Sequence, residues 1–108
     1  MAQGTPIEAT DATLEKIVKE NSNVVVDVTA AWCMPCKVIA PHIDDLSKKY
    51  TGKVVFAKLD ADKSPAKMRE YAIMGVPTLL FFKNGRLVDT IIGAVPKSHI
   101  EEKVRKYL

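Results

Sequence analysis

Cys33 and Cys36 are the only two cysteines of the chain, and they lie three residues apart in the segment Trp32-Cys33-Met34-Pro35-Cys36. The pair follows an apolar run and opens a segment with a helical pattern. A CxxC at a strand-to-helix junction is typical of a reversible dithiol–disulfide centre. Residues at i and i+3 of a helix are neighbours, so the two sulfurs can reach bonding distance without a movement of the backbone.

The order in which the two cysteines react follows from their places on the helix. We place Cys33 at the N-cap, with Met34 and Pro35 in the first two helical positions. Pro35 has no N–H, so the next free donor is the backbone N–H of Cys36, and the Cys33 sulfur can accept it. The positive end of the helix dipole also favours a thiolate there. We predict that Cys33 is the reactive nucleophile and that Cys36, one turn inside, is less exposed and acts second.

Two other uses of the cysteines are inert packing in the core and half of a zinc site. A tetrahedral zinc site would need two further ligands. Only His42 and His99 are available, and the chain has no second CxxC. His42 lies six residues beyond Cys36, which is almost two turns. We interpret both histidines as surface or partly buried residues and predict no metal site.

Asp27 interrupts the apolar run 24–28, where burial of an ionised side chain is costly. A buried carboxylate with a raised pKa can act as a general base near neutral pH. The alternative, that strand alternation points Asp27 to solvent, is disfavoured by the valines that precede it. Lys58, in the next expected strand, is a candidate charge partner, and a solvated lysine is the alternative.

Gly75-Val76-Pro77-Thr78 is the third feature with functional potential. Proline is tolerated at the start of a strand. It is also the residue before which cis peptide bonds occur, although most bonds of this kind are trans. These residues alone leave the isomer of the Val76–Pro77 bond open.

The elements that must position these residues follow from apolar periodicity and cap signals. Pro41 falls inside the expected second helix and should kink it. Asn84-Gly85 is a strong signal for a hairpin. The predicted elements are a weak edge strand at 5–9, a helix capped by Asp11 and ended by 21–23, a buried strand at 24–30, a helix at about 34–50, a buried strand at 54–59, a short helix at about 65–72, strands at 78–83 and 87–92, and a last helix with a capping box at 98–101. This order predicts one mixed sheet with helices on both faces.

The composition bounds the classes of function. With 108 residues, 47% of them hydrophobic and 27% charged, and a net charge of +3, we expect one soluble domain over 1–108. The chain has no basic stripe interleaved with aromatic residues and no apolar segment as long as a membrane span, so we expect neither nucleic acid nor membrane as a partner. The start is polar and has no long apolar segment, so we expect no secretory signal, and two close cysteines suit a reducing cytosol. A secreted form whose signal has been removed is the alternative.

Over essentially its whole length, the chain resembles the thioredoxin family, the usual example of a CxxC redox protein. The matching stretches are Val26-Asp27, Ala31-Trp32-Cys33 with Pro35-Cys36-Lys37, Ala40-Pro41, Lys58 with Asp60 and Asp62, Gly75-Val76-Pro77-Thr78, Phe82-Lys83-Asn84-Gly85, and Gly93-Ala94. The resemblance implies an α/β thioredoxin fold, with a central mixed sheet of four to five strands flanked by four helices on both faces. It also implies a thiol–disulfide oxidoreductase that reduces disulfides in protein substrates.

The resemblance further implies roles for individual residues. Cys33 is the attacking thiolate and Cys36 the resolving thiol. Asp27 is the buried carboxylate that helps to move the proton of Cys36, with Lys58 as its neighbour. Pro77 is a cis proline that faces the disulfide. The implied docking surface for substrates consists of Trp32, Met34, Pro35, Met74, Val76, Pro77, Gly93 and Ala94.

Partners and cofactors are also implied by the resemblance. The redox-active disulfide Cys33–Cys36 is the working group, with no bound cofactor and no metal. Thioredoxin reductase is the expected electron donor, so NADPH enters only indirectly, and oxidised proteins are the expected substrates. A cytoplasmic monomer is the expected form.

The chain departs from the family at two positions near the CxxC. Met34 stands where glycine is usual, and Val28 stands where phenylalanine is common. Met34 and Met74, together with Trp32 and Val76, would form a larger apolar rim, so we expect an altered choice of partners. The residues between the cysteines tune the redox potential in this family, and the direction of the change here is left open.

Two other functions compete with disulfide reduction. One is the reverse chemistry, that of an oxidase or isomerase, which differs in redox potential. The other is a binding module without catalysis. The presence of Cys33, Cys36 and Asp27 together argues against the binding module.

Overall fold

The computed structural model describes residues 4–108. The predicted order of strands and helices is confirmed, and the element boundaries lie within one or two residues of those predicted. The elements are β1 (Ile7–Ala9), α1 (Leu14–Glu20), β2 (Asn23–Thr29), α2 (Met34–Lys49), β3 (Val55–Asp60), the short 3-10 helix η1 (Ala61–Lys63), α3 (Pro65–Glu70), β4 (Thr78–Lys83), β5 (Arg86–Ile92) and α4 (Lys97–Lys106).

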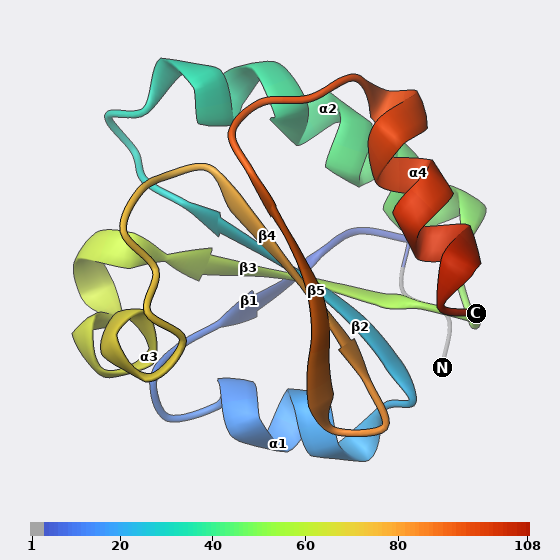
Figure 1. Cartoon of the computed structure of the whole chain (residues 1–108), viewed down its shortest axis with the longest axis horizontal. Helices are drawn as coiled ribbons and strands as arrows, with labels where there is room; N and C mark the ends of the chain where they lie inside the picture. Colours follow the sequence, from blue (N-terminus) through green and yellow to red (C-terminus); the bar gives the residue numbers. More distant parts are fainter. Residues whose placement is uncertain (1–3) are drawn as a thin grey trace.

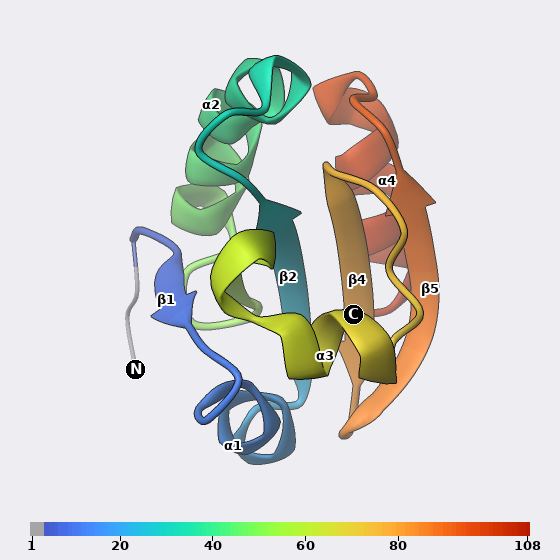
Figure 2. The same cartoon turned by 90° about the vertical axis from the view of Figure 1, so that its left-hand side faces the viewer.

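The five strands form one mixed sheet in the order β1-β3-β2-β4-β5, and Figure 2 shows β1 at one edge and β5 at the other. β3 pairs in parallel with β1 and β2, whereas β4 pairs antiparallel with β2 and β5. Parallel strands need long crossovers, which α1 and α2 provide, while the β4–β5 pair needs only a tight turn. β2 is therefore a central strand, and β1 is the short edge strand that was predicted.

Helices cover both faces of the sheet, as predicted. α2 and α4 lie on one face and α1 and α3 on the other (Figure 1). Successive residues of a strand point to opposite faces. Val25 accordingly packs in the cluster under α2 and α4, whereas Val24 and Val26 pack in the cluster with α1. Asp27, two residues after Val25, therefore points to the face that α2 covers.

The inner face of α2 has the apolar spacing of an amphipathic helix. Ile39, Ile43, Leu46 and Tyr50 recur at helical spacing and are all buried in one cluster with residues of the sheet and of α4. The helix continues through Pro41, whose ring removes one backbone hydrogen bond. The kink at Pro41 stays a prediction. This packing holds the start of α2, and with it the CxxC, over the sheet.

The predicted hairpin turn is confirmed at Asn84-Gly85. The φ angles of Asn84 and Gly85 are 51° and 83°. A type I′ turn needs positive φ at both central residues, which asparagine and glycine tolerate better than other residues. The turn joins β4 to β5 and so places Gly93, at the end of β5, beside the start of β4.

Asp11 caps a different helix from the one predicted. The N-cap of α1 is Thr13, and the Thr10 hydroxyl accepts the N–H of Thr13 at 3.2 Å. The Asp11 carboxylate instead accepts the N–H groups of Ala66 and Lys67, at 3.1 and 2.9 Å, in the first turn of α3. The Thr10 hydroxyl already accepts an N–H group at the start of α1. The Asp11 carboxylate therefore binds the N-terminus of α3, which lies far along the chain.

The predicted capping box at 98–101 is wrong. α4 begins one residue before Ser98, and its N-cap is Pro96, which has no side-chain group that could cap. The Glu101 carboxylate binds α2 and the residue that ends it. It accepts the hydroxyl of Tyr50 at 2.6 Å and forms an ion pair with Lys49 at 2.6 Å. Glu101 thus joins the two helices of one face instead of capping its own.

The two ends of the described range, 4–108, lie away from the CxxC. In Figure 1, α2 starts at one end of the long axis, and the last residues of α4 lie toward the other end. The chain also enters β1 from the side on which α4 ends. The start of α2 is therefore remote from both ends of the described chain.

Candidate active site

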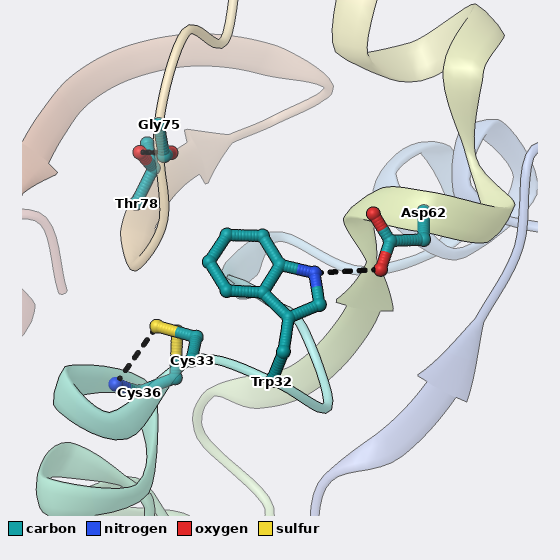
Figure 3. Close-up of a disulfide and its surroundings, with 6 residues drawn as sticks. All are labelled: Trp32, Cys33, Cys36, Asp62, Gly75 and Thr78. Carbon is teal, nitrogen blue, oxygen red and sulfur yellow. Dashed lines mark hydrogen bonds between the residues drawn. A yellow bond between two sulfur atoms is a disulfide. The ribbon is translucent and has the colours of Figure 1, made fainter.

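Cys33 and Cys36 are joined by a disulfide at the start of α2 (Figure 3). Their Cα atoms are 5.3 Å apart, which is usual for a disulfide. Cys33 is the N-cap of α2, and its sulfur accepts the backbone N–H of Cys36 at 3.2 Å. Pro35 lies in the first turn and has no N–H to compete for that sulfur. The predicted N-cap and its predicted donor are confirmed.

The two cysteines are buried to the same extent. Each is 3% exposed, so the prediction that Cys36 is the less exposed is wrong for the disulfide form. Val76 of the opposite loop packs against the cluster that the cysteines form with Ala30, and this cover is shared by both sulfurs. Cys33 therefore differs from Cys36 in its N-cap position and not in its accessible area.

The loop before β4 faces the disulfide (Figure 3). The Val76–Pro77 peptide bond is cis, as the resemblance implies. The Thr78 hydroxyl donates to the carbonyl of Gly75 at 2.7 Å, and the carbonyl of Pro77 accepts the N–H of Gly93 at 2.9 Å. These bonds tie the loop to β4 and to the end of β5, and so fix the surface opposite the cysteines.

Asp27 is 2% exposed in the middle of β2, so its predicted burial is confirmed. It lies in register with Lys58 on β3 and Leu79 on β4. Burial raises the pKa of Asp27 from 3.8 to about 6, while the charge of Lys58 lowers it and that of Asp44 raises it. Its Oδ1 atom has no hydrogen-bond partner among the described residues. A carboxyl group in this state can take up or release a proton near neutral pH.

Lys58 acts on Asp27 through charge, and its ion pair is with Asp44 of α2. The Lys58 Nζ atom lies 3.9 Å from Asp44 Oδ1, with the two side chains 27% and 47% exposed. Asp27, Lys58 and Asp44 therefore form a series of alternating charges from the sheet to α2. Asp44 was not predicted as a site residue, because its proximity to Lys58 arises only when α2 packs on β3.

Trp32 is held at the site by a contact that the sequence analysis did not assign. Its indole Nε1 donates to Asp62 Oδ2 at 2.9 Å (Figure 3). Asp62 is itself fixed in η1, because its backbone N–H is accepted by the Asp60 carboxylate at 2.9 Å. The segment after β3 thus anchors a tryptophan that is 68% exposed. The only sequence indication of this contact was that Asp62 is among the residues that match the thioredoxin family.

Exposed apolar side chains occur in the segments that carry and face the disulfide. We define the apolar rim as Trp32, Met34, Met74 and Val76. Met34 is 66% exposed and Met74 98% exposed, whereas Val76 is half-buried. Among the other predicted docking residues, Pro35 and Ala94 are exposed, Gly93 is half-buried and Pro77 is buried. The other exposed large apolar residues among those described are Ile7, Val38, Leu87, Val88, Ile92 and Leu108.

The described residues hold no evident metal site. Among residues 4–108, no group of three or more His, Cys, Asp or Glu side chains could hold a metal ion. His42 is half-buried and His99 is exposed, as expected from the sequence. Within the same range, no helix has the length and apolar character needed to cross a membrane.

Together, the sheet order, the CxxC at the start of α2 and the cis proline opposite define a CxxC protein of the thioredoxin fold. Comparison with a solved structure agrees, because the chain superposes on the N21Q mutant thioredoxin from Halobacterium salinarum NRC-1 with a TM-score of 0.92. The two share 26% sequence identity over 99% of this chain and 94% of that one.

The sequence comparisons identify the family. The thioredoxin family model matches residues 5–106. Over 94 residues the chain is 49% identical to the chloroplastic M-type thioredoxin of Pisum sativum, covering 87% of this chain and 55% of that protein. It is 42% identical over 94 residues to the thioredoxin of Synechocystis sp., covering 87% and 88%. The chain belongs to the thioredoxin family, and it spans about half the length of the pea relative.

Proposed function

We propose that this chain reduces disulfides in protein substrates by dithiol–disulfide exchange through Cys33 and Cys36. The observation that carries the proposal is the CxxC disulfide at the start of α2, with the Cys33 sulfur 3.2 Å from the backbone nitrogen of Cys36. Once the disulfide is reduced, that N–H and the helix N-terminus stabilise negative charge on the same sulfur. Membership of the thioredoxin family supports the same chemistry.

In the first proposed step, the Cys33 thiolate attacks one sulfur of a substrate disulfide. The S–S bond of the substrate breaks as a mixed disulfide with Cys33 forms, and the other substrate sulfur leaves as a thiolate that takes up a proton. The apolar rim and the backbone of the loop before β4 are the proposed docking surface, since Trp32 and Met34 adjoin Cys33 in the chain and Val76 packs against the cysteines. Because Met34 is exposed beside Cys33, it is proposed to bear on the choice of partner.

In the second step, Cys36 loses its proton and attacks the sulfur of Cys33. This attack forms the Cys33–Cys36 disulfide and releases the second substrate thiol, so that two electrons have passed to the substrate. Asp27 is the proposed acceptor of the Cys36 proton. Its support is a buried carboxyl with a pKa of about 6 on the strand that leads to the CxxC.

A further reaction must return the disulfide to the dithiol. We propose a thioredoxin reductase as the donor, with NADPH as the indirect source of electrons, and oxidised proteins as the acceptors. The proposed form is a monomer. The proposed location is the cytoplasm, on the basis of cysteine content, although the relatives from pea and spinach are named as chloroplastic.

Reduction of insulin by dithiothreitol tests the proposal. The wild-type chain should accelerate the reaction. Cys36→Ser that has been reduced and freed of dithiothreitol should accumulate a mixed disulfide with insulin, because the resolving thiol is absent. Cys33→Ser is the matched control and should trap none. An absence of both acceleration and trapping would refute disulfide exchange and leave a binding module.

Redox titration against glutathione separates reduction from the reverse chemistry. A reductase should have a potential well below about −200 mV, whereas isomerases and oxidases lie near −180 to −120 mV. A potential in the upper range would contradict the proposed direction. The titration also measures the effect of Met34, if Met34→Gly is titrated beside the wild type.

A further inference from the structure

Two of the methionines stand out by their position and exposure. Met34 occupies the first turn of α2 next to Cys33 and is 66% exposed. Met74 lies two residues before Val76, which packs against the cysteines, and it is 98% exposed. Met68 differs from both, since it is partly buried and packs against the core cluster with α1. Met34 and Met74 therefore belong to the two segments that border the redox centre, which are the start of α2 and the loop that faces it.

Two properties of a thioether matter at such a place. It is apolar and flexible, which suits it to binding varied partners. It is also open to oxidation to the sulfoxide, which is polar and carries a strong acceptor oxygen. A substrate that buries the rim removes these side chains from water, and a sulfoxide makes that removal unfavourable.

We propose that Met34 and Met74 are sites of oxidation by peroxide, and that their sulfoxides weaken the docking of protein disulfides while leaving the exchange chemistry of the cysteines intact. The inference rests on the proposed function, because it concerns the surface that would hold the substrate. It gives the apolar rim a second property, a sensitivity to oxidant that is separate from the state of the Cys33–Cys36 disulfide.

The chemical step is a transfer of one oxygen atom. The sulfur of the methionine attacks one oxygen of the peroxide, so the O–O bond breaks and an S–O bond forms. The remaining oxygen takes up the protons and leaves as water when the oxidant is hydrogen peroxide. The methionine is oxidised by two electrons and the peroxide is reduced, and the cysteines take no part.

The first measurement is the order of oxidation. The whole chain in its disulfide form, in which the cysteines have no free thiol, is treated with hydrogen peroxide and mapped by mass spectrometry. Sulfoxide is expected at Met34 and Met74 several-fold faster than at Met68. Equal rates at all three would overturn the proposal, because the partly buried residue would then be as reactive as the exposed pair.

The second measurement is activity after treatment, each protein being compared with its own untreated form. With insulin as substrate and dithiothreitol as reductant, oxidised wild type should lose about threefold to tenfold in kcat/KM. Its rate with the small disulfide 5,5′-dithiobis(2-nitrobenzoate), which needs little docking surface, should be unchanged. Met34→Leu combined with Met74→Leu should lose nothing on treatment, whereas the control Met68→Leu should lose as much as wild type.

Three results would overturn the proposal that sulfoxides weaken docking, and a fourth would count against the proposed function. Oxidation of both methionines without a change in insulin reduction overturns the proposal. So does an equal loss with both substrates, or a loss in the Met34→Leu, Met74→Leu protein, because the peroxide would then act elsewhere. Failure of the untreated wild type to reduce insulin is seen before any peroxide is added, and it counts against the proposed function instead.

Discussion

The difference in free energy of unfolding between Asp27→Asn and wild type should shift in favour of the variant between pH 4 and pH 8. The folded-state pKa of Asp27 is about 6, against 3.8 for the free side chain. The difference is about 2 pH units, and one unit corresponds to ~1.36 kcal/mol. Keeping Asp27 ionised in the fold therefore costs about 3 kcal/mol once the pH is well above 6.

The sign follows from where the proton is bound. Between pH 3.8 and about 6 the folded protein keeps a proton on Asp27 that the unfolded chain has released. The stability of wild type therefore falls as the pH rises through this window, and the loss persists at higher pH. The amide of the Asp27→Asn variant cannot ionise, so the free energy of unfolding of the variant lacks this fall. The difference between variant and wild type should grow by about 2–3 kcal/mol from pH 4 to pH 8.

Urea unfolding of the disulfide form at several pH values measures this difference. Any cost of burying the amide is independent of pH, so only the trend with pH is diagnostic. Asp45→Asn is the control for loss of a surface carboxylate, because Asp45 is on α2 with its side chain 57% exposed. If the two curves for Asp27→Asn and wild type run parallel within about 0.5 kcal/mol, the reasoning from burial is refuted.

Contacts that the fold creates between distant residues give two more predictions. Asp44→Asn removes a negative charge that raises the pKa of Asp27 and releases Lys58 from its ion pair, so the pKa of Asp27 should fall below 6 in an NMR titration of its carboxyl. An unchanged titration, with Asp45→Asn as the control, would remove Asp44 from the site. Asp11→Ala removes the acceptor at the start of α3 and should cost about 1–2 kcal/mol in urea unfolding. Asp11→Asn keeps an acceptor oxygen, so an equal loss in both variants would contradict the capping role.

The features that sequence analysis predicted correctly depend on neighbours in the chain. The N-cap place of Cys33 follows from a motif of four residues, and the hairpin at Asn84-Gly85 follows from the φ angles that these residues tolerate. The burial of Asp27 follows from the valines around it in one strand. In each case the physical cause lies within one element or one turn.

The errors concern polar side chains whose partners lie far along the chain. Asp11 binds backbone groups 55 and 56 residues away, and Glu101 binds Tyr50 at a separation of 51. Trp32 and Asp62 are 30 residues apart. Several donors can bind a carboxylate at a given place in the sequence. Tertiary packing determines which of these donors lies within hydrogen-bond distance.

The equal burial of the two cysteines had a related cause. Their places on α2 indicated which sulfur lies nearer the helix end, but the cover that both share comes from Val76 in a distant loop. Accessible area depends on everything that packs nearby, whereas the hydrogen bond to the Cys33 sulfur depends on the first turn of α2 alone. The second property was therefore predictable and the first was not.

The separation between the start of α2 and Leu108 (Figure 1) has a practical consequence for handling the protein. A tag, a dye or a surface linkage joined through Leu108 would sit at the opposite end of the molecule from the CxxC. An immobilised chain would present its disulfide and the apolar rim to the solution, in one orientation. The molecule is thus suited to capture of mixed disulfides on a solid support and to electrochemical measurement with a tethered film.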